Sequence, residues 1–123
     1  MKLKCVRASA GEAGDDIFQV LFEANPEQEH GPYVLIQRAW LEENEGAASP
    51  YYVETHDERL IGQYATLEVG LSRNRLVLRL PAPADESIEI DFTTPDRDFQ
   101  EIQHVLGIIL QRDLKEEARK NAD

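Results

Sequence analysis

The spacing of apolar residues changes once along the chain, near Thr94, and this change constrains the fold more than any other feature. Before it, apolar residues mostly recur at every second position, which is typical of β-strands with one buried face. After it, they recur every three or four positions, as in an amphipathic helix. A strand-rich region followed by one long helix predicts an α+β domain with a mostly antiparallel sheet.

Six or seven strands account for the region before the change. The clearest covers residues 75–80, where Leu76, Leu78 and Leu80 alternate with outward residues. The segment 33–40 is apolar on both faces at its centre, so we expect it in the middle of the sheet. The other strands are expected at residues 3–8, 17–23, 51–54, 61–71 and 87–92, and two prolines and a glycine predict a loop at 25–32.

The C-terminal helix is expected over about residues 95–118. Thr94 suits the N-cap and Pro95 the first helical position, where its missing N–H costs nothing. An apolar stripe wide enough to lie across a sheet is formed by Phe99, Ile102, Leu106, Ile109 and Leu110. The whole chain of 123 residues then fits a single domain, strand-rich over residues 1–93.

Composition and cysteine content indicate a folded cytoplasmic protein. With 41% hydrophobic and 30% charged residues, the chain has the composition of an ordinary globular domain. Residues 1–10 alternate basic with apolar residues and lack the apolar run of a signal peptide. No stretch approaches the roughly 20 apolar residues of a membrane helix. The single Cys5 excludes an internal disulfide framework, so the reducing cytoplasm is the expected location.

Charge is segregated along the sequence. Residues 11–58 hold twelve of the 24 acidic residues and one of the 13 basic ones, a formal charge of −11 that equals the net charge of the protein. Such a field repels nucleic acid and anionic membranes and attracts a basic protein. We therefore expect a protein partner and neither nucleic acid nor a membrane. A solvated surface that keeps the protein soluble explains the same acids equally well.

No catalytic, cofactor or metal motif stands out, and we predict that the protein is not an enzyme. The serines lack a nucleophile elbow, the glycines are dispersed, and the three histidines lie in unrelated segments. Cys5 is interpreted as a small buried hydrophobe. Glu89 and Asp91 are interpreted as outward residues of a solvated strand and not as an acid–base pair.

Acidic and aromatic residues occur together in residues 40–58, a mixture typical of protein-binding surfaces. At an interface, rim charges accelerate association while a few buried anchors hold the complex. Aromatic residues on strands are also typical of a core or of cross-strand pairs, and both interpretations stay open here. The candidate partner-binding residues are Trp40, Glu42, Glu43, Glu45, Tyr51, Glu54, Asp57 and Glu58.

Five segments between residues 51 and 110 follow one another in a recognisable order. They are an aromatic strand at 51–53, a glycine-containing segment at Gly62 and Gln63, strands at 74–80 and 88–92, and a helix carrying Val105, Leu106, Ile109 and Leu110. In this order they resemble the bacterial immunity proteins of polymorphic toxin systems and are most similar to the family called immunity protein ten. The resemblance covers about half of the chain.

The resemblance implies a small cytoplasmic protein that binds and neutralises a cognate toxin domain. It implies no catalytic residues and no cofactor. Many toxin domains are nucleases, which need basic surfaces to hold phosphate. An acidic inhibitor suits such a target, so the resemblance and the charge pattern agree on a basic toxin as the partner.

Two other classes of function stay open. Secretion chaperones are also small, acidic and often dimeric, although they usually begin with a helix and this chain begins with a strand pattern. A small-ligand binder or an enzyme would need a pocket assembled from residues that are distant in sequence. Whether the protein forms a homodimer is left open by the sequence.

Overall fold

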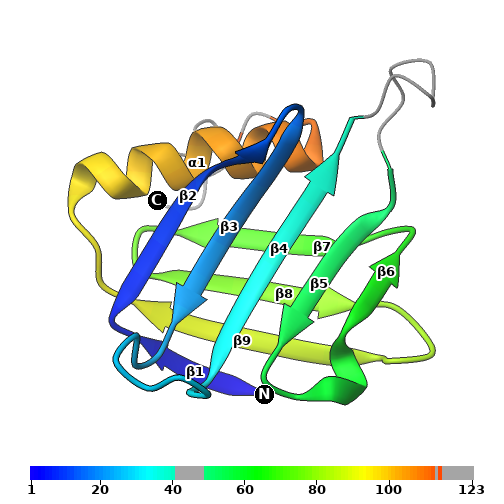
Figure 1. The fold of residues 1–123 in the computed structure, drawn as a ribbon, viewed down its shortest axis with the longest axis horizontal. Coiled ribbons are helices and arrows are strands. Elements are labelled where there is room, and N and C mark those ends of the chain that lie inside the picture. The colour runs from blue at the N-terminus through cyan, green and yellow to red at the C-terminus, as the bar shows by residue number, and fades with distance from the viewer. Residues whose placement is uncertain (41–48, 113, 115–123) are drawn as a thin grey trace.

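A computed structural model describes residues 1–40, 49–112 and 114, which form two β-sheets and one long helix (Figure 1). The predicted α+β class, the mostly antiparallel pairing and the long C-terminal helix are confirmed. Figure 1 shows the strands of one sheet crossing those of the other at a steep angle. None of the helices among the described residues has the length and apolar character needed to cross a bilayer.

The five-stranded sheet follows chain order. Its strands are β2 (Arg7–Gly14), β3 (Ile17–Glu23), β4 (Tyr33–Ala39), β5 (Tyr51–Thr55) and β6 (Gly62–Tyr64), and all neighbours are antiparallel. A short 3-10 helix, η2 (Glu58–Leu60), lies between β5 and β6. Strand β4 is central, as its apolar centre predicted.

The four-stranded sheet has the order β1 (Lys2–Cys5), β9 (Glu86–Phe92), β8 (Arg75–Leu80) and β7 (Glu68–Ser72). Strand β1 runs parallel to β9, and the other pairs are antiparallel. The three leucines of β8 that the alternation placed inward, Leu76, Leu78 and Leu80, are fully buried. The inner faces of both sheets therefore meet in one hydrophobic core.

Two segments predicted as single strands are each divided between the two sheets. Residues 3–8 become the end of β1 and the start of β2, and residues 61–71 become β6 and β7, so the described residues hold nine strands and not six or seven. The physical reason is a break in the period of two. Cys5 and Ala8 are both buried although they are three residues apart, and Val6 between them is 69% exposed. The chain turns a corner between the sheets at each break.

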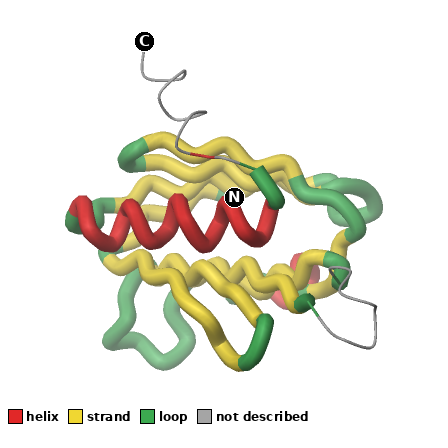
Figure 2. The backbone as a smooth tube through the Cα atoms, turned by 90° about the horizontal axis from the view of Figure 1, so that it is seen from above, coloured by secondary structure: helices red, strands yellow, loops and turns green. Residues whose placement is uncertain are grey.

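Helix α1 (Asp96–Leu110) lies between the two sheets at one end of the molecule (Figure 2). All five residues of the predicted apolar stripe are buried. The N-cap is Pro95 and not Thr94, and no side chain caps the helix start. The helix ends at Leu110 because Gln111 adopts a left-handed conformation with φ of 56°. The prediction extended it to about residue 118, and residues 113 and 115–118 lie outside the described residues.

Three phenylalanines connect the helix to both sheets. Phe22 of β3 lies 5.3 Å from Phe92 of β9, and Phe92 lies 6.4 Å from Phe99 of α1, measured between ring centroids. All three side chains are buried. Each aromatic pair adds about 0.5–1.5 kcal/mol beyond its buried area, so this chain of rings holds the three elements together.

Candidate functional site

A hollow of about 340 Å³ opens on the outer face of the five-stranded sheet. This face points away from α1 and from the four-stranded sheet, which lie on the other side in Figure 2. Strands β3, β4 and β5 form the floor, and the loop between β3 and β4 forms a wall. The strand residues that line it are Gln19, Leu21, Glu23, Tyr33, Leu35 and Glu54.

The register of the strands sets the chemistry of the floor. Leu21 of β3 lies opposite Leu35 of β4, and Leu35 lies opposite Glu54 of β5. Residues paired in this way point to the same face of a sheet. Because their neighbours Val20 and Ile36 are fully buried in the core, this row faces outward. The floor therefore combines two leucines with one carboxylate.

The loop between β3 and β4 is held by its own hydrogen bonds. The backbone N–H of Ala24 donates to the carbonyl oxygen of Pro32 at 3.0 Å, which closes the loop at its base. The N–H of Gln28 donates to the carbonyl oxygen of Asn25, also at 3.0 Å. This shape places Gln28 and Glu29 at the rim of the hollow.

Glu54 is a fixed carboxylate. Tyr33 donates its hydroxyl to Oε2 and Tyr52 donates its hydroxyl to Oε1, each at 2.7 Å. The bonds from Tyr52 and Tyr33 lower the pKa of Glu54. Burial, together with the bond to Glu54, raises the pKa of Tyr33 to about 12. Glu54 is therefore ionised and both tyrosines are neutral at physiological pH.

Carboxylates around the hollow are poorly compensated by cations. Glu54 and Glu29 form no ion pair with any described residue. Glu23 has one distant partner, the Nε of Arg7 at 3.9 Å. The tip of the β2–β3 hairpin adds the exposed Asp15 and Asp16 to the same sheet. The outer face of this sheet and its loops therefore carry net negative charge.

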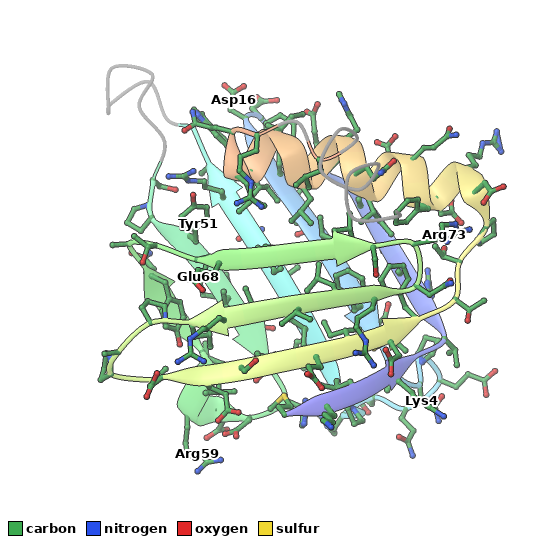
Figure 3. The ribbon with its side chains drawn as sticks, turned by 180° about the vertical axis from the view of Figure 1, so that it is seen from behind. Lys4, Asp16, Tyr51, Arg59, Glu68 and Arg73 are labelled. Carbon is green, nitrogen blue, oxygen red and sulfur yellow. The ribbon has the colours of Figure 1, made fainter. Side chains whose placement is uncertain are left out.

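The outer face of the four-stranded sheet, which is toward the viewer in Figure 3, differs because its acids are paired with bases. Its acids and bases alternate across neighbouring strands, so that opposite charges face each other. Two cross-strand ion pairs result, Lys2–Glu89 at 3.7 Å and Arg75–Asp91 at 2.8 Å. Arg79 of β8 forms a third, at 3.0 Å, with Asp85 of the loop before β9. The charge segregation along the sequence thus becomes a difference between two faces.

Arg38, the one base within residues 11–58, points into the molecule. Its Nη1 donates to the carbonyl oxygen of Ile109 and its Nε to that of Ser49, both at 2.8 Å. The guanidinium lies 3.9 Å from the ring centroid of Tyr51 and 5.5 Å from that of Trp40. Through the bond to Ile109, Arg38 ties α1 to the five-stranded sheet. Because it forms no ion pair with a carboxylate of the described residues, it does not offset their negative charge locally.

The structure separates the predicted partner-binding residues. Only Glu54 lines the hollow. Trp40 and Tyr51 flank Arg38 on the core side, and Trp40 packs edge-on against Phe18 with centroids 5.8 Å apart. Of the described candidates, Asp57 and Glu58 also lie outside the lining of the hollow.

Asp57 and Glu58 lie at the start of η2. Asp57 accepts from the backbone N–H of Arg59 and forms an ion pair with its guanidinium at 2.7 Å. The side-chain bond from Arg59 lowers the pKa of Asp57 to about 2. This aspartate acts as a cap, while Glu58 is exposed. Glu42, Glu43 and Glu45 lie outside the described residues.

Several residues of the hollow were not predicted. Leu21, Leu35, Tyr33, Glu23 and Glu29 come from two strands and a loop that the sequence did not bring together. The sequence held one indication of the hollow. Leu21 and Leu35 are apolar, although the alternation along their strands places them on the outward face. Register, which no local pattern reveals, decides that they meet.

Nothing in the described residues forms an evident reactive centre. Cys5 is buried, and burial and the charge of Glu23 raise its pKa to about 11, so its thiol stays protonated. Within the described part of the chain, no three His, Cys, Asp or Glu side chains are grouped so as to hold a metal ion.

No family model, curated protein or solved structure matches this chain. The resemblance to the immunity protein ten family therefore stays a prediction. The features that bear on function are the hollow, the carboxylates around it and the contrast between the two outer faces.

Proposed function

We propose that this protein is a non-catalytic binding protein that captures a basic protein on the outer face of its five-stranded sheet and neutralises it. The observation that carries the proposal is the difference between the two outer faces. One face pairs its charges, whereas the other surrounds a hollow with three carboxylates, of which Glu29 and Glu54 have no ion pair among the described residues and Glu23 has one at 3.9 Å. An unpaired field of one sign is an electrostatic complement for a basic surface.

The two parts of this face have different physical roles. The exposed acids at the rim attract a basic partner and accelerate its association, most strongly at low salt. The floor, with Leu21, Leu35 and Tyr33 beside the carboxylate of Glu54, offers the partly apolar centre in which interface anchors are found. Steering and anchoring are therefore available on one surface.

A toxin domain is the proposed partner, and the proposed setting is the bacterial cytoplasm. Nuclease toxins need a basic surface to bind phosphate, and an acidic inhibitor that covers this surface blocks substrate access. The resemblance to immunity proteins supports this choice of partner.

Co-purification with the product of the adjacent gene tests the proposal, followed by affinity measurements on charge-reversed variants. The double variant Glu27→Lys/Glu29→Lys alters the exposed rim and is expected to weaken binding by about tenfold or more at low salt. The matched control, Glu68→Lys/Glu101→Lys, makes the same charge change at exposed positions of β7 and α1. Equal losses for both variants, or no loss for either, contradict the acidic-face proposal.

A small-ligand binder is the second candidate, because a hollow of about 340 Å³ lies within the size range of ligand sites. The secretion-chaperone alternative makes a different prediction, a stable dimer in solution. Light scattering of the purified protein tests the chaperone alternative, which a monomer contradicts. The toxin-binding and ligand-binding hypotheses do not require a dimer.

A further inference from the structure

The hollow on the five-stranded sheet has features that suit one particular cation and not positive charge in general. We infer that it receives a single arginine side chain of the partner protein. The inference rests on the proposed function for the identity of the partner, but it concerns one pocket and has its own test.

The carboxylate of Glu54 keeps acceptor capacity on both of its oxygens. Each of its oxygens accepts one tyrosine hydroxyl, from Tyr33 and from Tyr52. A carboxylate oxygen has two lone-pair positions, so each oxygen keeps one for an incoming donor. A guanidinium presents two parallel N–H groups that match such a pair of oxygens, whereas an ammonium is a point charge.

The floor beside Glu54 suits the aliphatic stem of an arginine. Leu21 and Leu35 lie in the same row across the sheet, and Pro32 adds apolar surface from the loop. Long cationic side chains bury their methylene groups on such surfaces while the charged head reaches a polar partner. The hollow therefore combines an apolar track with a fixed anion at its end.

None of the described residues places a cation in this position. Among the described residues that line the hollow there is no lysine or arginine, while three carboxylates lie there, those of Glu23, Glu29 and Glu54. The nearby Arg7 reaches only Glu23, at 3.9 Å. No described residue supplies a cation to Glu54. The steering field favours a partner protein that carries many basic groups as the source of one.

The first test uses N-acetyl-L-arginine amide as the probe in an amide NMR titration of the full chain. Saturable shifts are expected at Leu21, Tyr33, Leu35 and Glu54, with a dissociation constant on the order of millimolar. N-acetyl-L-lysine amide is expected to bind several-fold more weakly. Shifts that do not saturate, or equal binding of both probes, overturn the inference.

Two variants check that Glu54 is the anchor. Glu54→Gln is expected to weaken the arginine probe by about tenfold, and Tyr33→Phe, which keeps the ring and the charge, by about fivefold. The matched control Glu68→Gln removes a charge on the other sheet and is expected to leave binding unchanged. Unchanged binding in both hollow variants overturns the inference. If only one of the two variants folds, as its amide spectrum shows, unchanged binding in that variant overturns it.

Failure of the inference is distinguishable from failure of the proposed function. If the partner binds with an affinity that Glu54→Gln does not change, the hollow is not an arginine pocket and the binding function stands. If the arginine probe saturates the hollow but no basic protein is captured, the pocket stands and the toxin-neutralising function is wrong.

Discussion

Replacement of Arg38 by methionine tests how the acidic sheet is joined to the helix. Methionine keeps most of the apolar stem but loses both hydrogen bonds, to the carbonyl oxygens of Ile109 and Ser49, and the contact with the ring of Tyr51. Ile109 belongs to the last turn of α1, whose carbonyl groups lack intrahelical partners. The variant therefore removes a cation that satisfies the negative end of the helix.

The expected cost is about 3.5 kcal/mol. A hydrogen bond from a charged donor contributes about 1.5–3 kcal/mol, and a cation over an aromatic ring about 0.5–2 kcal/mol. We take the low end of each range because Arg38 is half-buried and water can reach the freed carbonyl oxygens. This is a large fraction of the roughly 5–15 kcal/mol that stabilises a typical domain.

Urea unfolding followed by the fluorescence of Trp40, the single tryptophan, measures the loss. With a slope of about 1.5 kcal/mol per molar urea, the midpoint is expected to fall by about 2 M. Arg38→Lys keeps the charge but not the two-point geometry and is expected to lose about half as much. Arg79→Met removes an exposed arginine paired with Asp85 and is expected to cost under about 1 kcal/mol. A loss below about 1 kcal/mol in Arg38→Met would refute the role assigned to this arginine.

Three further predictions concern the helix end, titration and the core. Gln111→Gly relieves the left-handed conformation and is expected to raise stability by about 0.5–1 kcal/mol in thermal unfolding; a loss contradicts the assigned helix cap. Since the folded pKa of Asp57 is lowered to about 2, its stabilising contribution is complete above pH 4 and lost as the pH falls toward 2. The folded pKa of Tyr33 is raised to about 12, so its contribution is complete below pH 10 and lost between pH 10 and 12. Acid and alkaline unfolding of Asp57→Asn and Tyr33→Phe checks both, and an unchanged pH profile counts against them. Phe92→Ala is expected to cost about 3–5 kcal/mol in urea unfolding, and a loss under about 1 kcal/mol contradicts its place between the sheets and the helix.

The local spacing of apolar residues was enough to predict which side chains of a single strand or helix are buried. The alternation in β8 predicted the burial of Leu76 and Leu78, and the wider spacing predicted the buried stripe of α1. Both signals depend only on the side-chain period of a strand or helix. The same reasoning placed β4 at the centre of its sheet, because both of its faces are apolar there.

Long-range features were beyond such patterns. Val6 marks the corner at which the chain leaves the four-stranded sheet, but a break in alternation does not say where the chain goes next. The hollow depends on the register that sets Leu21 against Leu35 and Leu35 against Glu54. The inward course of Arg38 depends on a helix that lies 71 residues away in sequence.

The charge pattern was visible in the sequence but its division between two faces was not. The acids of residues 11–58 were evident from counting. Glu89 and Asp91 are paired with Lys2 and Arg75, while Glu54 has no ion pair within the part of the chain that the structure describes; this follows only from the way the strands are arranged. Pairing between strands therefore decides which acids remain available to a partner.

Amide NMR of the labelled protein, titrated with the product of the adjacent gene, tests the central proposal most directly. The largest shifts are expected on the outer face of the five-stranded sheet, at Leu21, Tyr33, Leu35 and Glu54, and to weaken as salt is raised. Shifts centred on the outer face of the four-stranded sheet, at Val77 and Glu89, would contradict the assignment of the binding surface.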